Sequence, residues 1–321
     1  MPVISGLQLG ARVSGKAETL SAIQSYASDI KNAGAKLVVL PEALLGGYPK
    51  GADFGARVGF RTDKGRKDFR QYWENAIDVP GDECDALASL SAQTGASLVV
   101  GVIERAGATL FCTALFFDPV EGLVGKHRKL MPTGSERLIW GKGDGSTMPA
   151  VTTELGPIGA AICWENYMPH FRSAMYAKGL SIWCAPTVDD RDIWQSSMRH
   201  IAYEGRCFLV SACQYMPPPD KAARPKDWPK DKPFIRGGSV IISPMGEILA
   251  EPLYGREGLV SADIDLGAII EARYDLDVAG HYARPDIFSL QVDEQPKHNV
   301  EALNATAPRS EDGDLTDEPI S

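Results

Sequence analysis

The 321 residues are 44% hydrophobic and 23% charged, a composition typical of one large globular α/β domain with appendages. The formal net charge is −9, but residues 291–321 hold eight acidic and two basic residues, so the rest of the chain carries only −3 and offers no basic surface for nucleic acid. No apolar run approaches the roughly 20 residues that span a membrane, and the N-terminus lacks a basic leader, so we expect a cytoplasmic protein.

The first half of the chain predicts an alternation of strands and helices. After an N-terminal strand, apolar residues recur at helical spacing over 16–33, and Leu37–Leu40 is a buried-strand pattern, so the chain opens as a β–α–β unit. Residues 52–80 mix aromatic and charged side chains and predict an insertion. A helix over 82–94 precedes three strands, over 97–103, 110–118 and 123–129. The tight glycine turns between these strands indicate that part of the sheet is antiparallel.

The second half repeats this alternation. It predicts, in order, a helix over 166–178, a strand over 180–185, a helix over 193–206 and a strand over 208–214. Six prolines between Tyr215 and Phe234 indicate an exposed insertion at about 215–235. A β meander over 238–243, 247–254 and 259–263 and a short helix over 266–273 are then expected. Residues 1–290 form the expected catalytic domain, and residues 291–321 an acidic arm, extended or disordered.

Cys163 is the strongest candidate for a nucleophile. The apolar run Gly159–Ile162 predicts a strand that delivers this thiol to the start of a helix, where backbone N–H groups stabilise a thiolate. A buried core cysteine is the alternative, but the polar and aromatic residues that follow suit the rim of a pocket. The other five cysteines have neither the spacing of a disulfide framework nor that of a zinc site, so no metal and no other cofactor is expected.

Two further strands end at residues that a thiol nucleophile requires. Glu42 follows the strand Leu37–Leu40 and could act as a base, and Lys129 ends a strand and could stabilise negative charge. Because the carboxyl ends of strands in α/β sheets gather at one edge, these side chains can converge on Cys163. Residues 126–129 form a run of cationic side chains, and strand alternation places only His127 and Lys129 of this run on one face.

Three motifs resemble the nitrilase superfamily, and in particular its nitrilase branch, over about residues 3–290. They are Val39–Ala43 with Gly46–Gly51, His127–Arg137, and Cys163–Pro169, with further likeness at Ala185–Thr187, His200–Cys207 and His281–Phe288. The resemblance implies an α/β fold, a four-layer αββα sandwich with mixed sheets. It also implies no cofactor.

The resemblance implies a role for each candidate residue. Glu42 would be the general base, Cys163 the nucleophile and Lys129 the electrophilic partner, with Glu136 as a second carboxylate that orients Lys129 or water. Glu136 depends on the resemblance alone, because its position in the sequence otherwise favours a solvated surface acid. The expected reaction is hydrolysis of an organic nitrile to a carboxylic acid and ammonia through a thioimidate and a thioester on cysteine.

Two other functions stay open at this stage. An amidase or carbamoylase could use the same four residues, and an inactive filament-forming protein would be expected to lack some of them. Tyr48 and Trp164, with Trp140 as a further candidate, suggest an aromatic pocket for aryl or arylaceto nitriles, although Tyr48 could equally be a surface aromatic and aliphatic nitriles remain open.

The same resemblance implies a homodimer that builds a larger oligomer or spiral. We expect the helices at 166–178 and 193–206 to pair, because Phe171, Met175, Tyr176, Met198 and Ile201 are more apolar residues than one core face needs. The insertions and the acidic arm are the expected extension contacts, and a compact dimer with loose appendages is the alternative.

Overall fold

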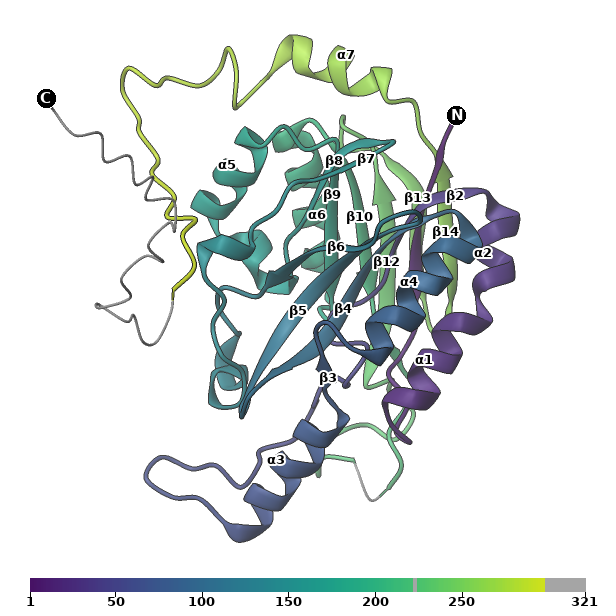
Figure 1. Ribbon diagram of the computed structural model, residues 1–321, viewed down its shortest axis with the longest axis vertical. Coiled ribbons are helices and arrows are strands. Elements are labelled where there is room, and N and C mark those ends of the chain that lie inside the picture. The colour runs from purple at the N-terminus through teal and green to yellow at the C-terminus, as the bar shows by residue number, and fades with distance from the viewer. Residues whose placement is uncertain (222–223, 298–321) are drawn as a thin grey trace, which may run out of the picture.

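Two β-sheets lie face to face in the computed structural model, which describes residues 1–221 and 224–297 (Figure 1). Strand alternation gives each sheet one inward face, and apolar side chains such as Val39 and Val210 meet between the sheets. Two more apolar clusters, around Leu87 and around Trp183, lie beneath the helices that cover the outer faces.

The first sheet has seven strands among the described residues, in the order β14-β1-β2-β4-β5-β6, with β3 beside β4. β1, β2 and β4 run parallel, whereas β14, β5 and β6 pair antiparallel with their neighbours. The bounds are β1 (Val3–Gln8), β2 (Ala35–Val39), β3 (Ile77–Asp78), β4 (Ser97–Ala106), β5 (Thr109–Asp118), β6 (Gly122–Arg128) and β14 (Gly258–Asp263).

The second sheet is also mixed and has seven strands in the described part of the chain. Its order is β11-β12-β10-β9-β8-β7, with β13 beside β12, and the parallel pairs are β8 with β9 and β9 with β10. The bounds are β7 (Val151–Thr153), β8 (Gly156–Ala160), β9 (Ile182–Thr187), β10 (Phe208–Cys213), β11 (Tyr215–Met216), β12 (Ile235–Ile242) and β13 (Ile248–Tyr254).

Helices cover both outer faces. In Figure 1, α1, α2 and α4 lie over the first sheet and α5 and α6 over the second, which confirms the predicted four-layer αββα sandwich. The bounds are α1 (Lys16–Ser25), α2 (Ala27–Ala33), α3 (Asp63–Asn75), α4 (Asp82–Thr94), α5 (Pro169–Ala177), α6 (Asp192–Gly205) and α7 (Gly267–Asp275), with 3₁₀ turns η1 (Gly134–Leu138), η2 (Gly145–Thr147) and η3 (Cys163–Tyr167).

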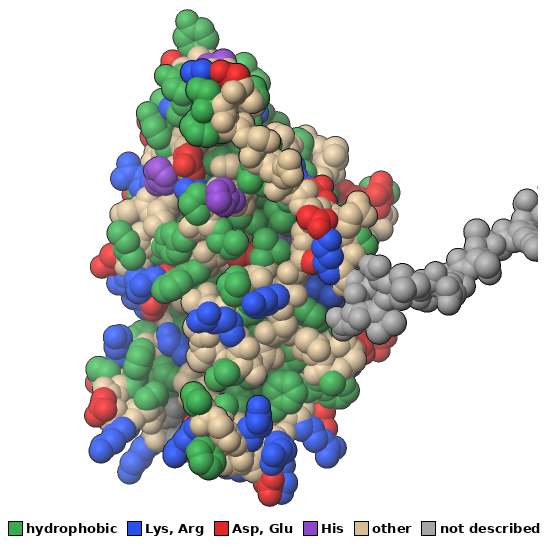
Figure 2. All heavy atoms as spheres, turned by 90° about the vertical axis from the view of Figure 1, so that its left-hand side faces the viewer, with side chains coloured by type: hydrophobic (Ala, Val, Ile, Leu, Met, Phe, Trp, Pro, Cys, Tyr) green, Lys and Arg blue, Asp and Glu red, His purple; other side chains and the backbone are tan. Residues whose placement is uncertain are grey.

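The predicted insertion at 52–80 contains α3, which projects from one end of the sandwich (Figure 1). Lysine and arginine side chains gather at the lower end of the face in Figure 2. The loop before α3 and the helix itself carry six exposed cations, namely Arg57, Arg61, Lys64, Arg66, Lys67 and Arg70.

The predicted arm lies partly outside the described residues, because the structure describes only 291–297 of it. This short part contacts the body, where Glu294 pairs with Lys178 at 2.5 Å and the Lys297 N–H donates to Asp144 Oδ2 at 2.8 Å. In the second predicted insertion, residues 222 and 223 are likewise outside the described range.

Two of the predicted elements are wrong in detail. The single helix over 16–33 is two helices, α1 and α2, separated at Tyr26. The predicted β meander is not one sheet segment, because β13 pairs with β12 whereas β14 crosses to the other sheet and pairs with β1. The pairing with β1 ties the end of the domain to its first strand.

The predicted delivery of Cys163 to a helix start needs correction. β8 ends at Ala160, Cys163 begins the five-residue turn η3, and α5 starts only at Pro169. The proline explains this late start, because it favours the first position of a helix and restricts the residue before it to extended backbone, as in Met168 with ψ 105°. No long helix therefore begins at the thiol.

The expectation that α5 and α6 carry more apolar residues than one core face needs is also wrong. Phe171, Met175, Tyr176, Met198 and Ile201 are at most 6% exposed and fill the core beneath α5 and α6 of their own chain. They leave no apolar surface of their own for a partner. The homodimer and the spiral stay predictions.

All six cysteines are free thiols and buried. Within the described ranges, no helix combines the length and the apolar character that a membrane span requires. The cytoplasmic location stays a prediction.

Gly101 on β4 allows the chain after β2 to pass close to the sheet. The Gly101 carbonyl accepts a hydrogen bond from the Leu44 N–H at 2.8 Å, and a Cβ at this glycine would lie 2.1 Å from the Pro41 carbonyl oxygen. Only glycine permits this approach. Gly101 thereby sets the path of the segment that carries Glu42.

We predict that Gly101→Ala lowers the free energy of unfolding by about 1–3 kcal/mol, because the added methyl group overpacks against Pro41. Urea unfolding measures this loss. Gly125→Ala is the matched control on β6, where the nearest atom to the new Cβ is a Val151 methyl group at 3.3 Å. Equal stability of the two variants would contradict the packing role of Gly101.

Candidate active site

The candidate residues lie at the carboxyl ends of strands from both sheets. Glu42 follows β2, Lys129 follows β6 and Cys163 follows β8. β6 runs in the same direction as β2, because two antiparallel pairings separate it from the parallel strands. Its end therefore reaches the same edge of the sheet, as the sequence predicted.

Lys129 is buried between two carboxyl groups. Its ammonium Nζ lies 2.6 Å from Glu42 Oε1 and 2.9 Å from Glu136 Oε2. Burial disfavours the charged lysine, but the two carboxylates outweigh it and raise the pKa of Lys129 well above its usual value. Lys129 is therefore a fixed positive charge in this site.

The two carboxylate oxygens of Glu42 differ in their hydrogen bonding. Oε1 accepts from Lys129, and Oε2 is buried without a hydrogen-bond partner among the described residues. Burial raises the pKa of Glu42, while the charge of Lys129 acts against this rise. Glu42 Oε2 is thus an acceptor atom that no described residue occupies.

The resting state of Cys163 is the protonated thiol. Burial, together with the negative charge of Glu42, raises its pKa far above the usual range. The Thr187 hydroxyl donates to Cys163 Sγ at 3.3 Å and so steadies the sulfur. A thiol of this kind needs a neighbouring base to become a nucleophile.

Backbone strain is concentrated beside these residues. Cys163 has φ 51° and Ala43, directly after Glu42, has φ 49°, whereas side-chain-bearing residues rarely adopt positive φ. Such strain persists where surrounding contacts hold it, commonly at functional sites. The Asn166 side chain provides such contacts by donating to the carbonyls of Ala161 and Cys163, at 2.9 and 2.8 Å.

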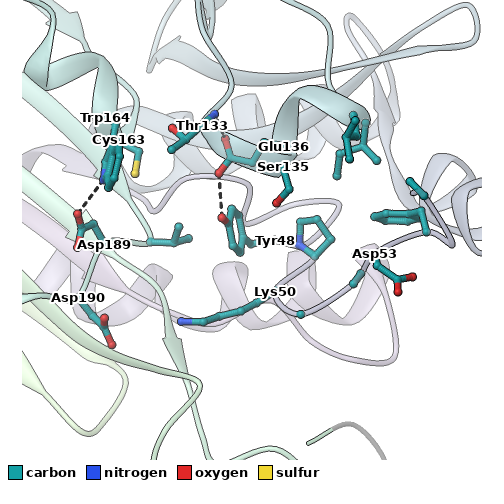
Figure 3. Close-up of a pocket in the computed structure, with 18 of the residues that line it drawn as sticks. Tyr48, Lys50, Asp53, Thr133, Ser135, Glu136, Cys163, Trp164, Asp189 and Asp190 are labelled. Carbon is teal, nitrogen blue, oxygen red and sulfur yellow. Dashed lines mark hydrogen bonds between the residues drawn. The ribbon is translucent and has the colours of Figure 1, made fainter. Parts of the chain in front are cut away.

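Glu136 is not the solvated surface acid that its sequence position favoured. The turn η1 folds it back onto Lys129, and its carboxylate accepts from the Thr133 N–H at 2.7 Å and from the Tyr48 hydroxyl at 2.8 Å. Tyr48 is therefore not a free surface aromatic. Figure 3 shows Tyr48 pointing its hydroxyl at Glu136.

A cavity of about 550 Å³ opens beside these residues, but Glu42 and Lys129 do not line it. Cys163, Glu136, Tyr48 and Trp164 line it together with charged residues, among which Lys50, Asp53, Asp189 and Asp190 are labelled in Figure 3. Trp164 is 42% exposed and donates its indole N–H to Asp189 at 2.9 Å. The cavity is large enough for a small organic substrate.

Trp140 does not line this cavity. It is buried behind the site, where its ring lies 5.6 Å from the Lys129 ammonium and 5.9 Å from the Tyr48 ring. Its ring therefore packs behind the lysine and the tyrosine.

Sequence reasoning assigned no role to three further residues near the site. Thr187 contacts the sulfur, Cys112 Sγ lies 3.7 Å from Glu42 Oε1, and the Gln214 amide donates to the Glu42 carbonyl at 2.7 Å. Thr187 at the end of β9 could have been found, because it terminates a strand next to the cysteine strand. Cys112 and Gln214 carry no such signal, since each sits within or beside an apolar run.

The chain is similar to a known protein family and to several of its members. Residues 4–274 match the carbon–nitrogen hydrolase family. The chain is 55% identical over 271 residues to an aliphatic nitrilase of Sinorhizobium fredii, covering 83% of this chain and 87% of the relative. It is 53% identical over 299 residues to a bifunctional nitrilase/nitrile hydratase of Nicotiana tabacum, covering 91% of this chain and 85% of the relative.

The fold is shared with more distant proteins. The solved structure of the NitFhit protein of C. elegans superposes with a TM-score of 0.72 at 18% identity, covering 93% of this chain and 68% of that one. The sandwich, the match over residues 4–274 and the two close relatives lead to one conclusion: the chain belongs to the carbon–nitrogen hydrolase family, in its nitrilase branch.

Proposed function

We propose that this protein hydrolyses an organic nitrile to a carboxylic acid and ammonia. The observation that carries the proposal is a thiol, Cys163, at the wall of a cavity and beside a buried Glu42–Lys129 pair. The identity of more than half of the aligned residues to an aliphatic nitrilase supports nitriles as the substrate class.

In the proposed first step, Glu42 accepts the Cys163 proton and the sulfur attacks the nitrile carbon. A carbon–sulfur bond forms as one carbon–nitrogen π bond breaks, and Lys129 with the backbone N–H of Trp164 stabilises the negative charge on nitrogen. The nitrogen then takes up the proton from Glu42. The product is a thioimidate on Cys163.

In the second step, a water molecule adds to the thioimidate carbon with Glu42 as base. The nitrogen gains protons and leaves as ammonia, so a thioester remains. A second water molecule cleaves the carbon–sulfur bond, releases the carboxylic acid and returns the proton to the thiol. Glu136 keeps Lys129 in place throughout, as its 2.9 Å contact suggests.

The cavity wall favours an aromatic substituent on the nitrile. Tyr48, Phe54 and Trp164 contribute rings, and Leu138, Ile139 and Val188 add apolar side chains. We therefore propose aryl or arylaceto nitriles as preferred substrates, since flat apolar groups pack well against such walls.

A nitrile panel tests this function. We predict that purified protein releases ammonia faster from aryl and arylaceto nitriles than from aliphatic nitriles of similar size, and faster from nitriles than from the matching amides. Ammonia release at equal substrate concentrations measures both ratios. Faster hydrolysis of amides would replace the nitrilase proposal with an amidase.

We predict that Cys163→Ala and Cys163→Ser abolish turnover without loss of the fold, because the sulfur both attacks and leaves. Ammonia release and thermal unfolding measure the two effects. Cys184→Ala is the matched control, since this cysteine is buried on β9 with no site residue as a partner. Activity of Cys163→Ala comparable to that of the control would refute the assignment.

The pH profile tests the proposed role of Glu42. Glu42 must be ionised to accept the thiol proton, and burial raises its pKa above the ordinary 4.5. Activity is therefore present above the raised pKa and is lost as pH falls through it, so kcat/KM should decline at a pH above 4.5. Circular dichroism at each pH controls for unfolding. A flat kcat/KM down to pH 4.5 in folded protein would contradict this role.

A further inference from the structure

A second buried ion pair lies next to the candidate active site and outside its cavity. His127 Nε2 lies 2.9 Å from Glu165 Oε2, and neither side chain is exposed to solvent. Neither residue lines the cavity. The catalytic steps described above do not use this pair.

The Glu165 carboxylate joins the backbone on both sides of the site. Its Oε1 accepts the Leu130 N–H at 2.5 Å, and its Oε2 accepts the Ile162 N–H at 2.7 Å. Leu130 directly follows Lys129, and Ile162 directly precedes Cys163. One side chain therefore links the lysine strand of the first sheet to the cysteine turn of the second.

His127 supplies the third hydrogen bond to this carboxylate. Its Nδ1 faces the Thr147 carbonyl at 2.5 Å, and a carbonyl only accepts, so Nδ1 carries a proton. Nε2 must also carry one if it is to donate to a carboxylate. Burial opposes the charge on His127, but Glu165 outweighs it and raises the pKa of the histidine, which favours an imidazolium.

We propose that Glu165, held by His127, is a positioning residue that fixes Cys163 relative to Lys129. This inference depends on the proposed function in that it takes Cys163 as the nucleophile. The carboxylate holds the peptide groups adjoining Cys163 and Lys129, and Cys163 adopts a strained φ of 51° that requires such restraint. Small displacements of a nucleophile from its partner lower reaction rates steeply.

Glu165→Gln tests the proposal with little change in volume. A carboxamide has one acceptor oxygen, so its NH₂ group must face at least one of the three N–H donors, and that donor loses its partner. We expect kcat for nitrile hydrolysis to fall about 10- to 100-fold, with KM within about threefold of the parent. The loss in kcat alone would reflect displaced reacting groups and not a weakened cavity.

The alkylation rate of Cys163 by iodoacetamide gives a second readout that does not require nitrile turnover. Peptide mass spectrometry separates Cys163 from the other five cysteines. We expect the rate at Cys163 to fall in Glu165→Gln, since the thiol is displaced from Glu42. If the parent protein hydrolyses no nitrile, the proposed function fails, while this rate still tests the positioning role.

Glu204→Gln is the matched control. Like Glu165, Glu204 is a carboxylate that accepts hydrogen bonds within the chain, from Arg172 at 2.7 Å and from Tyr176 at 2.9 Å. These contacts lie on the helices outside the second sheet. We expect Glu204→Gln to lower the melting temperature and to leave the Cys163 alkylation rate within about twofold of the parent rate. His127→Gln is the second test variant, expected to lie between the parent and Glu165→Gln, and it carries the test if Glu165→Gln does not fold.

One outcome would overturn the proposal. If the test variants melt at lower temperature, as Glu204→Gln does, but retain the parent kcat and the parent alkylation rate, then the His127–Glu165 pair only stabilises the fold. A fall in both rates that the control does not share supports the positioning role.

Discussion

The site depends on one buried cation shared by two carboxyl groups. Lys129 lies within 3 Å of both Glu42 and Glu136, and removing one partner of such a buried pair typically costs about 3–5 kcal/mol, because the remaining charge is left uncompensated. The same arrangement serves chemistry. It fixes a positive charge beside the thiol and leaves one oxygen of Glu42 without a hydrogen-bond partner among the described residues. In the proposed mechanism, the base and the stabilising cation are therefore in place before a substrate binds.

The two sheets make this arrangement possible, because each brings one part of the site. The first sheet carries Glu42 and Lys129, and the second carries Cys163 on a strained turn. The close approach at Gly101 sets the path of the segment that carries Glu42. Glu165 links the two sheets next to Lys129 and Cys163. The edge between the sheets is thus held by backbone contacts as well as by side chains.

Much of this site could be predicted from sequence, because Glu42, Lys129 and Cys163 each follow a local strand pattern. Glu136 could not be derived from its pattern, since only the fold of η1 returns it to the lysine. The crossing of β14 to the other sheet depends on a partner strand whose paired residues lie 250 (Gln8 and Gly258) to 260 (Val3 and Asp263) positions away in sequence, which no local pattern reports. The apolar residues of α5 and α6 misled the prediction because composition does not tell a deep core from a second interface.

The most direct measurement of this account is peptide mass spectrometry of protein quenched during turnover of a nitrile. The account predicts an added mass on the peptide that contains Cys163, matching a thioimidate or a thioester of the substrate, and none on the other cysteines. It also predicts that the adduct disappears as the substrate is consumed. Turnover with unmodified Cys163, or an adduct on Cys112 instead, would contradict the central claim that this thiol is the nucleophile.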